Sequence, residues 1–240
     1  MSAAIMFLAF GIMAFLASQA EGAETTIDWS KDTVIPVVGE VDSQLIGQAG
    51  FIENLINEDK PDKVIKIFIN SPGGSVIAGN IFIQSMEVAK ARGFRIKCAV
   101  SNIAASMAMH ILTHCNERYV LKGGYLLFHE ARVQVGGIMT SREMRRMAQS
   151  MDVMTYTLEE YMVDQLGCTP SFYREHNEGE TMWTAETFQQ NFPKFKLQLI
   201  RDLKVPKTVQ QGVFKPINDK APPPSKGKVG SPAQIPWGVK

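Results

Sequence analysis

Three short segments of the chain carry groups that could take part in a reaction. The first, residues 70–75 with the sequence NSPGGS, lies where a β-branched run gives way to a helical pattern. Gly73 and Gly74 let the backbone turn tightly with unhindered N–H groups, which suit a developing negative oxygen or a phosphate. A Pro-Gly-Gly segment is also a common turn, so this segment by itself specifies no chemistry.

The other two segments supply a hydroxyl and an imidazole. Ser106 lies in residues 102–108, NIAASMA, at the expected start of a helix, where the helix dipole favours negative charge and small neighbours leave the hydroxyl open. His129 ends an apolar run, LLF at 126–128, and follows Ser106 by 23 residues. Each residue also has a plain interpretation, as a helix N-terminal serine and as a structural histidine, so the residues alone leave both open.

Alternating strand and helix patterns surround these segments. Val34–Val41 and Val64–Asn70 are β-branched runs, and Gln44–Asn57 between them repeats apolar residues at helical spacing. The alternation continues with helices predicted at Val76–Ala91 and Ala104–Thr113 and with strands predicted at Arg95–Val100, Arg118–Leu121 and Tyr125–Ala131. We therefore expect an α/β fold of repeated β-α-β units around a mostly parallel sheet.

A long helix is predicted from Ser141 to Gln165. Its methionine-rich stripe steps by three and four residues and comprises Met144, Met147, Met151, Met154, Leu158 and Met162. Such a stripe must be buried, either against the core of the same chain or against a neighbouring subunit. Because the helix is long for one small domain, we expect it to protrude and to mediate self-association.

The composition is that of a globular protein with a hydrophobic core. The 240 residues are 45% hydrophobic and 20% charged, and the formal net charge is +1. Seven lysines and one aspartate give residues 204–240 a charge of +6, so the rest of the chain carries −5. A mildly negative folded body does not suit nucleic-acid binding, which requires a basic face.

The cysteines and histidines predict neither a disulfide framework nor a metal site. Three cysteines are an odd number without Cys-x-x-Cys spacing, and we expect Cys98 and Cys115 to be buried, inert thiols. His110 and His114 are four residues apart on a predicted helix, but no glutamate follows His110 and no third ligand is evident. No cofactor is expected.

The two ends of the chain differ from the body between them. Residues 1–20 hold an uncharged apolar run that ends in small residues, which predicts a cleaved export signal or a membrane anchor. The folded domain is expected over residues 25–204, and the Pro/Lys-rich residues 205–240 are expected to form a disordered tail. We thus expect a periplasmic, extracellular or membrane-anchored protein, and a cytoplasmic one only if residues 1–20 are not a working signal.

Together, the three reactive segments resemble the proteolytic subunit of Clp protease, ClpP, a self-compartmentalised serine peptidase. The family's glycine loop I-N-S-P-G-G-S matches Ile69–Ser75, its nucleophile motif A-A-S-M matches Ala104–Met107, and its strand-terminal histidine matches Phe128–His129. Weaker similarity extends from about Thr33 to Phe192. The serine and glycine motifs also occur in enoyl-hydratase-like enzymes, and the histidine narrows the resemblance to ClpP.

The resemblance implies a ClpP/crotonase-like fold and a role for each matched residue. Ser106 corresponds to the nucleophile and His129 to the general base, while N–H groups of the Gly73-Gly74 turn and of Met107 correspond to the oxyanion hole.

The third member of the catalytic triad departs from the family pattern. ClpP relatives carry an aspartate shortly before a helix that begins Ser/Thr-Ala-x-Glu, and here Thr184-Ala185-Glu186 opens that helix. The position of the aspartate is matched by Glu180, whose carboxylate can also orient an imidazole. Three neighbours are rivals for this role: His176, Asn177 and Glu178.

Three other functions are weighed against a ClpP-type endopeptidase that hydrolyses peptides or unfolded proteins. A membrane-associated Ser-Lys protease of the signal-peptide-peptidase kind needs a lysine near Ser106. An enoyl-hydratase-like enzyme would use carboxylates at the positions of Ser106 and His129. A non-catalytic ring subunit is the third alternative.

The family also implies partners. These are stacked heptameric rings of the chain itself and a separate Clp-type ATPase, since the chain has no Walker-type loop. An exported chain would meet no ATP, which argues against the ATPase here.

Overall fold

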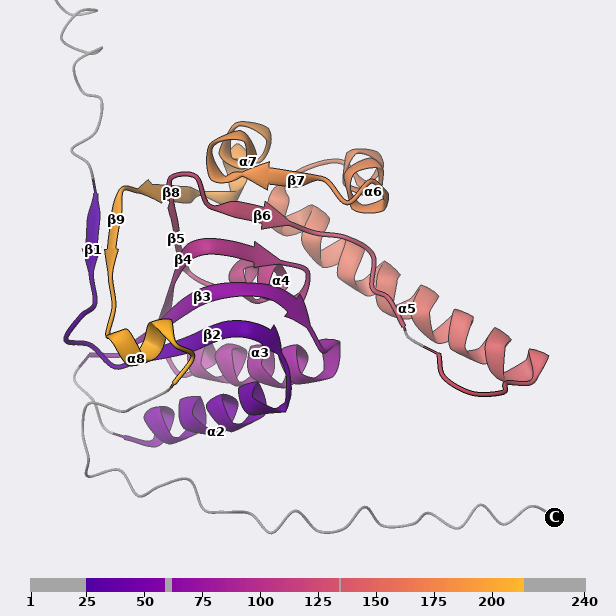
Figure 1. Ribbon diagram of the computed structural model, residues 1–240, viewed down its shortest axis with the longest axis horizontal. Helices are drawn as coiled ribbons and strands as arrows, with labels where there is room; N and C mark the ends of the chain where they lie inside the picture. Colours follow the sequence, from indigo (N-terminus) through magenta and orange to yellow (C-terminus); the bar gives the residue numbers. More distant parts are fainter. Residues whose placement is uncertain (1–24, 59–61, 134, 214–240) are drawn as a thin grey trace, which may run out of the picture.

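The computed structural model describes residues 25–58, 62–133 and 135–213. Its main sheet has seven strands in the order β2-β3-β4-β5-β8, with β6 beside β4 and β7 beside β6 (Figure 1). The strands are β2 (Val34–Val41), β3 (Val64–Gly74), β4 (Arg95–Ala105), β5 (Glu117–Leu121), β6 (Tyr125–Leu127), β7 (Met182–Thr184) and β8 (Leu197–Ile200). All pairs in this sheet are parallel except β6 with β7. The predicted α/β class and mostly parallel sheet are confirmed.

Alternating side chains of the central strands divide the core between the two faces of the sheet. In β3, Ile65, Ile67 and Ile69 point to the face covered by α2 (Ser43–Asn57), α3 (Val76–Ala91) and α4 (Met107–Thr113). Phe68 points to the opposite face. This period of two follows from the pleat of an extended chain, and both faces are apolar because both are covered.

A smaller layer covers the second face. It contains a two-stranded parallel sheet of β1 (Thr26–Asp28) and β9 (Asp202–Lys204), and the short helix α8 (Lys207–Gln210). Val205 and Val209 are buried there with Trp29 and Phe68. The predicted boundary at residue 204 is therefore too early, because these two valines carry the folded body past it. The rest of the predicted tail, residues 214–240, and the predicted signal or anchor at residues 1–20 lie outside the described residues.

The helix α5 (Ser141–Leu166) extends away from the body of the molecule (Figure 1). It begins with a capping box, in which Thr140 Oγ1 accepts from Glu143 N and Glu143 Oε2 accepts from Thr140 N, and it ends at Gly167 with a left-handed φ of 64°. Met162 and Leu166 near its C-terminal end are buried, whereas Met144 near the other end is 61% exposed. The protruding helix is confirmed, and its apolar stripe is only partly covered within one chain.

After α5 the chain returns to the main sheet through two short helices, one short strand and a 3-10 turn. The helix α6 (Pro170–Glu178) precedes β7, and α7 (Ala185–Asn191) and the 3-10 turn η1 (Pro193–Phe195) follow it. The predicted strand Tyr125–Ala131 is shorter in the structure and ends at Leu127, which leaves residues 128–140 without regular structure among those described.

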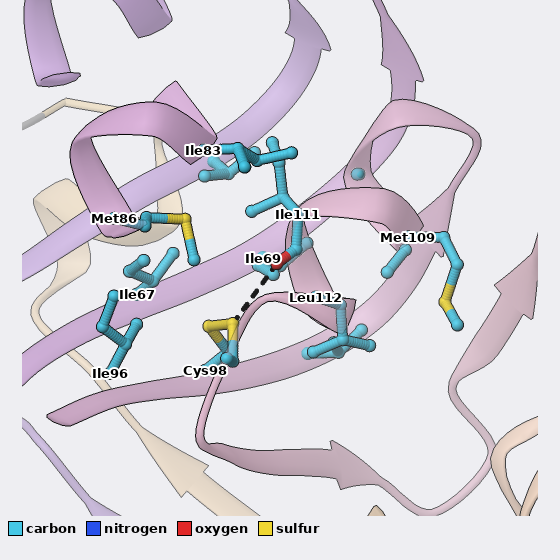
Figure 2. Close-up of a cluster of buried hydrophobic side chains, with 14 of the residues drawn as sticks. Ile67, Ile69, Ile83, Met86, Ile96, Cys98, Met109, Ile111 and Leu112 are labelled. Carbon is cyan, nitrogen blue, oxygen red and sulfur yellow. Dashed lines mark hydrogen bonds between the residues drawn. A yellow bond between two sulfur atoms is a disulfide. The ribbon is translucent and has the colours of Figure 1, made fainter. Parts of the chain in front are cut away.

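A disulfide joins Cys98 to Cys115 inside the larger core, so the expectation of two inert thiols is wrong. Figure 2 shows the bond at Cys98 among buried side chains that include Ile67, Met86 and Ile111. The chain leaves β4 at its C-terminal end, returns through α4, and places Asn116 N within 2.8 Å of Ile96 O. This return brings the two Cα atoms to 6.0 Å, an ordinary separation for a disulfide. Cys168 is the free cysteine of the described chain.

Candidate active site

Ser106 occupies a sharp turn between β4 and α4. Its φ of 54° and ψ of −124° lie outside the regions that non-glycine residues usually adopt, so the turn holds the residue in a strained conformation. Ser106 N donates to Leu127 O at 2.9 Å, and His110 N donates to Ser106 O at 3.1 Å. The turn is thus fixed on one side by the end of β6 and on the other by the first turn of α4.

The parallel pairing of β4 with β6 brings the predicted serine and histidine together. Ala105 pairs with Leu127, so Ser106 and His129 follow immediately after paired positions. Both residues line one pocket of about 50 Å³. The remaining lining residues are Val76, Met107, His110, Phe128, Ala131, Leu158, Met162 and Tyr173. Most of these are apolar, which makes the pocket suitable for a side chain of modest size beside the reactive group.

Of the two glycines predicted for the oxyanion hole, Gly73 lies against the serine turn. Its φ is 97°, and a methyl group on its Cα would sit 2.5 Å from Ser106 Cβ and 2.9 Å from Met107 N. Only glycine permits this approach. The N–H of Gly73 donates to Ser71 Oγ at 3.1 Å in this structure. The neighbouring Gly74 has its close contacts with β2, where a methyl group would meet Val41 O at 2.5 Å.

Glu180 lies near His129 along the sheet, but its carboxylate is paired elsewhere. The antiparallel β6–β7 ladder ends with the pair Leu127–Met182, so His129 and Glu180 each lie two residues beyond that pair. The Glu180 side chain is 47% exposed and forms an ion pair with Arg132. His129 Nδ1 is buried and has no hydrogen-bond partner among the described residues. The structure therefore brings the predicted triad residues into one region without joining the carboxylate to the imidazole.

The three rivals of Glu180 are placed differently from one another. His176 Nδ1 lies 3.1 Å from Thr181 Oγ1, and its ring contacts Phe172 and Trp183. Glu178 is exposed. Asn177 is buried, and its Oδ1 has no hydrogen-bond partner among the described residues. Glu180 therefore remains the carboxylate whose place in the chain, two residues beyond the last β6–β7 pair, matches that of His129 best.

The two histidines considered for a metal site form an aromatic group with Tyr161 of α5. The His114 ring stacks on Tyr161 at 4.4 Å, and the His110 ring meets Tyr161 edge-on at 5.4 Å. His114 Nδ1 also lies 2.7 Å from Glu87 Oε1. Among the described residues no group of three potential ligands could hold a metal ion.

His110 lines the pocket beside Ser106, a position that the sequence analysis does not predict for it. Burial, with a smaller contribution from His114, lowers the pKa of His110 to about 4, so its imidazole is neutral at neutral pH. The position of His110 four residues after Ser106, one turn along the predicted helix, is the feature of the sequence that indicates a place beside the serine.

The fold and the site define an α/β protein of the ClpP/crotonase type, with a serine on a strand-to-helix turn beside a histidine. The chain matches the family model of Clp protease over residues 21–190. The chain therefore belongs to the Clp protease family, and it is a serine-type endopeptidase of that family.

Two relatives show how distant the similarity is. The ATP-dependent Clp protease proteolytic subunit 2 of Tropheryma whipplei (strain Twist) is 28% identical over 170 residues, which cover 70% of this chain and 92% of the relative. The ATP-dependent Clp protease proteolytic subunit of Streptococcus agalactiae serotype V is 27% identical over 169 residues, which cover 68% of this chain and 83% of the relative.

No helix in the described ranges is long and apolar enough to cross a membrane.

Proposed function

We propose that Ser106 is the nucleophile and His129 the general base of a ClpP-type peptidase that hydrolyses peptides or unfolded proteins. In this reaction Ser106 Oγ attacks the substrate carbonyl carbon while His129 takes the hydroxyl proton. The C–N bond then breaks as His129 returns the proton to the leaving amine, and water hydrolyses the acyl-enzyme. The observation that carries the proposal is that both residues line one pocket at the strained β4–α4 turn.

The oxyanion in this proposal is stabilised by backbone N–H groups at the glycine turn and at Met107. The close approach of Gly73 to Ser106 and Met107 supports this role. The Gly73 N–H must turn from Ser71 Oγ toward the substrate to donate. Gly74 is the weaker candidate because its nearest neighbours belong to β2.

Glu180 is the proposed third member of the triad, and Arg132 is its competitor. The carboxylate needs to leave Arg132 and accept from the Nδ1–H of His129, which now has no partner. Arg132 can release the carboxylate because it lies in the segment between β6 and α5, whose described residues form no helix or strand. An enzyme whose triad is completed only by this rearrangement would be less active before it than after it.

The proposed working form is an oligomer built through α5. This helix exposes the apolar side chains of Met144, Val153 and Tyr156, which suit a subunit contact. The relatives are named as subunits of an ATP-dependent protease. Whether this chain also uses a Clp-type ATPase depends on its compartment.

We place that compartment outside the cytoplasm. The buried Cys98–Cys115 disulfide supports this, because disulfides persist in oxidising compartments and are rare in the cytosol. The uncharged segment at residues 1–20 points the same way. Hydrolysis of short or already unfolded peptides without ATP suits such a location.

The chemistry of Ser106 also separates this proposal from its alternatives. No lysine is among the residues that line the pocket, within the part of the chain that the structure describes, which argues against a Ser-Lys dyad. A non-catalytic subunit would keep the fold but lose the reactivity of the serine.

A fluorophosphonate probe tests the proposal directly. We expect the probe to modify wild-type protein at Ser106, as located by peptide mass spectrometry, and to leave Ser106→Ala unmodified. His129→Ala should lose most of the labelling, whereas Ser101→Ala, a serine on the same strand, should keep it. No labelling of the assembled wild-type protein would mean a non-catalytic subunit, and labelling that survives His129→Ala would refute the assigned base.

A further inference from the structure

His110 is a polar residue in a pocket wall that is otherwise mostly apolar. It lies one helical turn after Ser106 and on the same side of α4, because its N–H donates to Ser106 O at 3.1 Å. The walls around it come from Val76, Met107, Phe128, Leu158 and Met162. A ligand side chain that enters this pocket next to Ser106 therefore meets mostly hydrocarbon and, besides the proposed base His129, the imidazole of His110.

The imidazole is held in place but is not fully hydrogen-bonded. Its ring meets Tyr161 at 5.4 Å and His114 at 5.2 Å, in both cases edge-on. Its Nδ1 is buried and has no partner among the described residues. A buried polar atom without a partner is costly, and most such atoms in native proteins are satisfied by some group, water or ligand.

The charge and size of the pocket limit what can enter. The neutral His110 offers no charge to a carboxylate or an ammonium group, and burying either without a counter-charge is strongly unfavourable. The pocket volume of about 50 Å³ is small, which disfavours the largest aromatic side chains. The side chains that suit the pocket are therefore uncharged and of medium size.

Among these, an amide matches a neutral imidazole best. The imidazole has one donor and one acceptor nitrogen, and which nitrogen carries the proton depends on the partner. A carboxamide both donates and accepts, so it can pair with either tautomer. A thioether of the same length fills the same space but makes at most a weak hydrogen bond.

We propose that His110 is a specificity-determining residue, which makes the pocket beside Ser106 favour an uncharged hydrogen-bonding side chain such as glutamine at the residue whose carbonyl is attacked. This inference rests on the proposed function of Ser106. It assigns to His110 a contact with the substrate and no step in bond cleavage.

Two quenched fluorescent peptides that differ only by glutamine or methionine at the scissile residue provide the test. The ratio of kcat/KM for glutamine over methionine is measured for wild-type protein and for His110→Phe, with cleavage at the intended bond verified by mass spectrometry. One neutral hydrogen bond contributes about 0.5–1.5 kcal/mol, so the ratio should fall by about 2- to 10-fold in the variant. His114→Phe is the matched control, because it removes an imidazole from the same aromatic group outside the pocket, and its ratio should not change.

The outcomes separate this inference from the function on which it rests. An unchanged ratio in a His110→Phe protein that still cleaves the methionine peptide would overturn the inference alone. Equal losses for both peptides would show a merely structural role and would also overturn it. If wild-type protein neither cleaves a peptide nor reacts with the fluorophosphonate, both the function and the inference fail. Should His110→Phe not fold, His110→Leu is measured in its place.

Discussion

The disulfide between Cys98 and Cys115 should contribute a measurable part of the stability of this protein. The bond closes a loop with a sequence separation of 17. The loss of chain entropy in the unfolded state for a loop of this length corresponds to about 3 kcal/mol at 25 °C. Both sulfurs are buried in the larger core, so little solvation energy offsets this contribution.

We expect reduction to lower the free energy of unfolding by about this amount without unfolding the protein. In the reduced state the Cys115 thiol can donate to Ile111 O, which already lies 3.4 Å from the sulfur, and the Cys98 thiol is a weak donor that can be buried at little cost. For a chain of this size the loss corresponds to a decrease in Tm of about 6–12 °C.

The measurement is urea and thermal denaturation of the mature protein with and without a reductant. Cys98→Ala/Cys115→Ala is compared with wild type at one protein concentration, because assembly would add a concentration-dependent term. Reductant should lower the stability of wild type and of the control Cys168→Ala but leave the double variant unaffected.

Alkylation of the unfolded, unreduced chain, with the modified cysteines counted by mass spectrometry, tests whether the Cys98–Cys115 disulfide forms. One modified cysteine is expected, at Cys168. Three modified cysteines in protein isolated from its own compartment would show that the bond does not form, and the argument for an oxidising location would fall with it.

Three further predictions concern the site. Gly73→Ala should slow fluorophosphonate labelling of Ser106 by about 100-fold, because the new methyl group displaces the serine. Gly123→Ala is the control, since Gly123 has a similar φ but a methyl group there would meet nothing within 4 Å, and it should not slow the labelling. Equal effects of the two substitutions would mean that backbone strain alone matters. Glu180→Gln should reduce kcat by up to about 10⁴-fold with the fold intact, and an unchanged rate would remove this residue from the triad. The pKa of about 4 for His110 lies below its unfolded value of about 6.5, so stability should be complete above pH 6.5 and fall by up to about 3 kcal/mol toward pH 4. His110→Phe should flatten this part of a plot of unfolding free energy against pH, and an equally steep plot for the variant would contradict the assigned pKa.

The sequence predicted those parts of the fold that depend on local periodicity. The β-branched run of β3 and the helical spacing of α2 and α3 need no information from distant residues, and their bounds differ from expectation mainly at the ends. The strand β4 extends to Ala105 rather than Val100, because its pairing with β6 continues the ladder beyond the apolar run. This extension places Ser106 at a turn rather than inside a helix.

The features that the sequence did not predict depend on where distant residues meet. Cys98 and Cys115 are close because α4 returns along β4, a path that neither spacing nor cysteine count reveals. The pairing of Glu180 with Arg132 likewise depends on the register between β6 and β7 and on the conformation of the chain beyond it. The folded segment after residue 204 is signalled by only two buried valines, too few to form a recognisable pattern.

The two ends of α5 lie in different surroundings. Leu158 and Met162 form part of the wall beside Ser106, whereas Met144 is exposed and lies about 21 Å from Leu158 along the helix axis. Because one continuous helix carries both the pocket wall and the exposed end, a ligand that displaces α5 at its exposed end would also displace Leu158 and Met162.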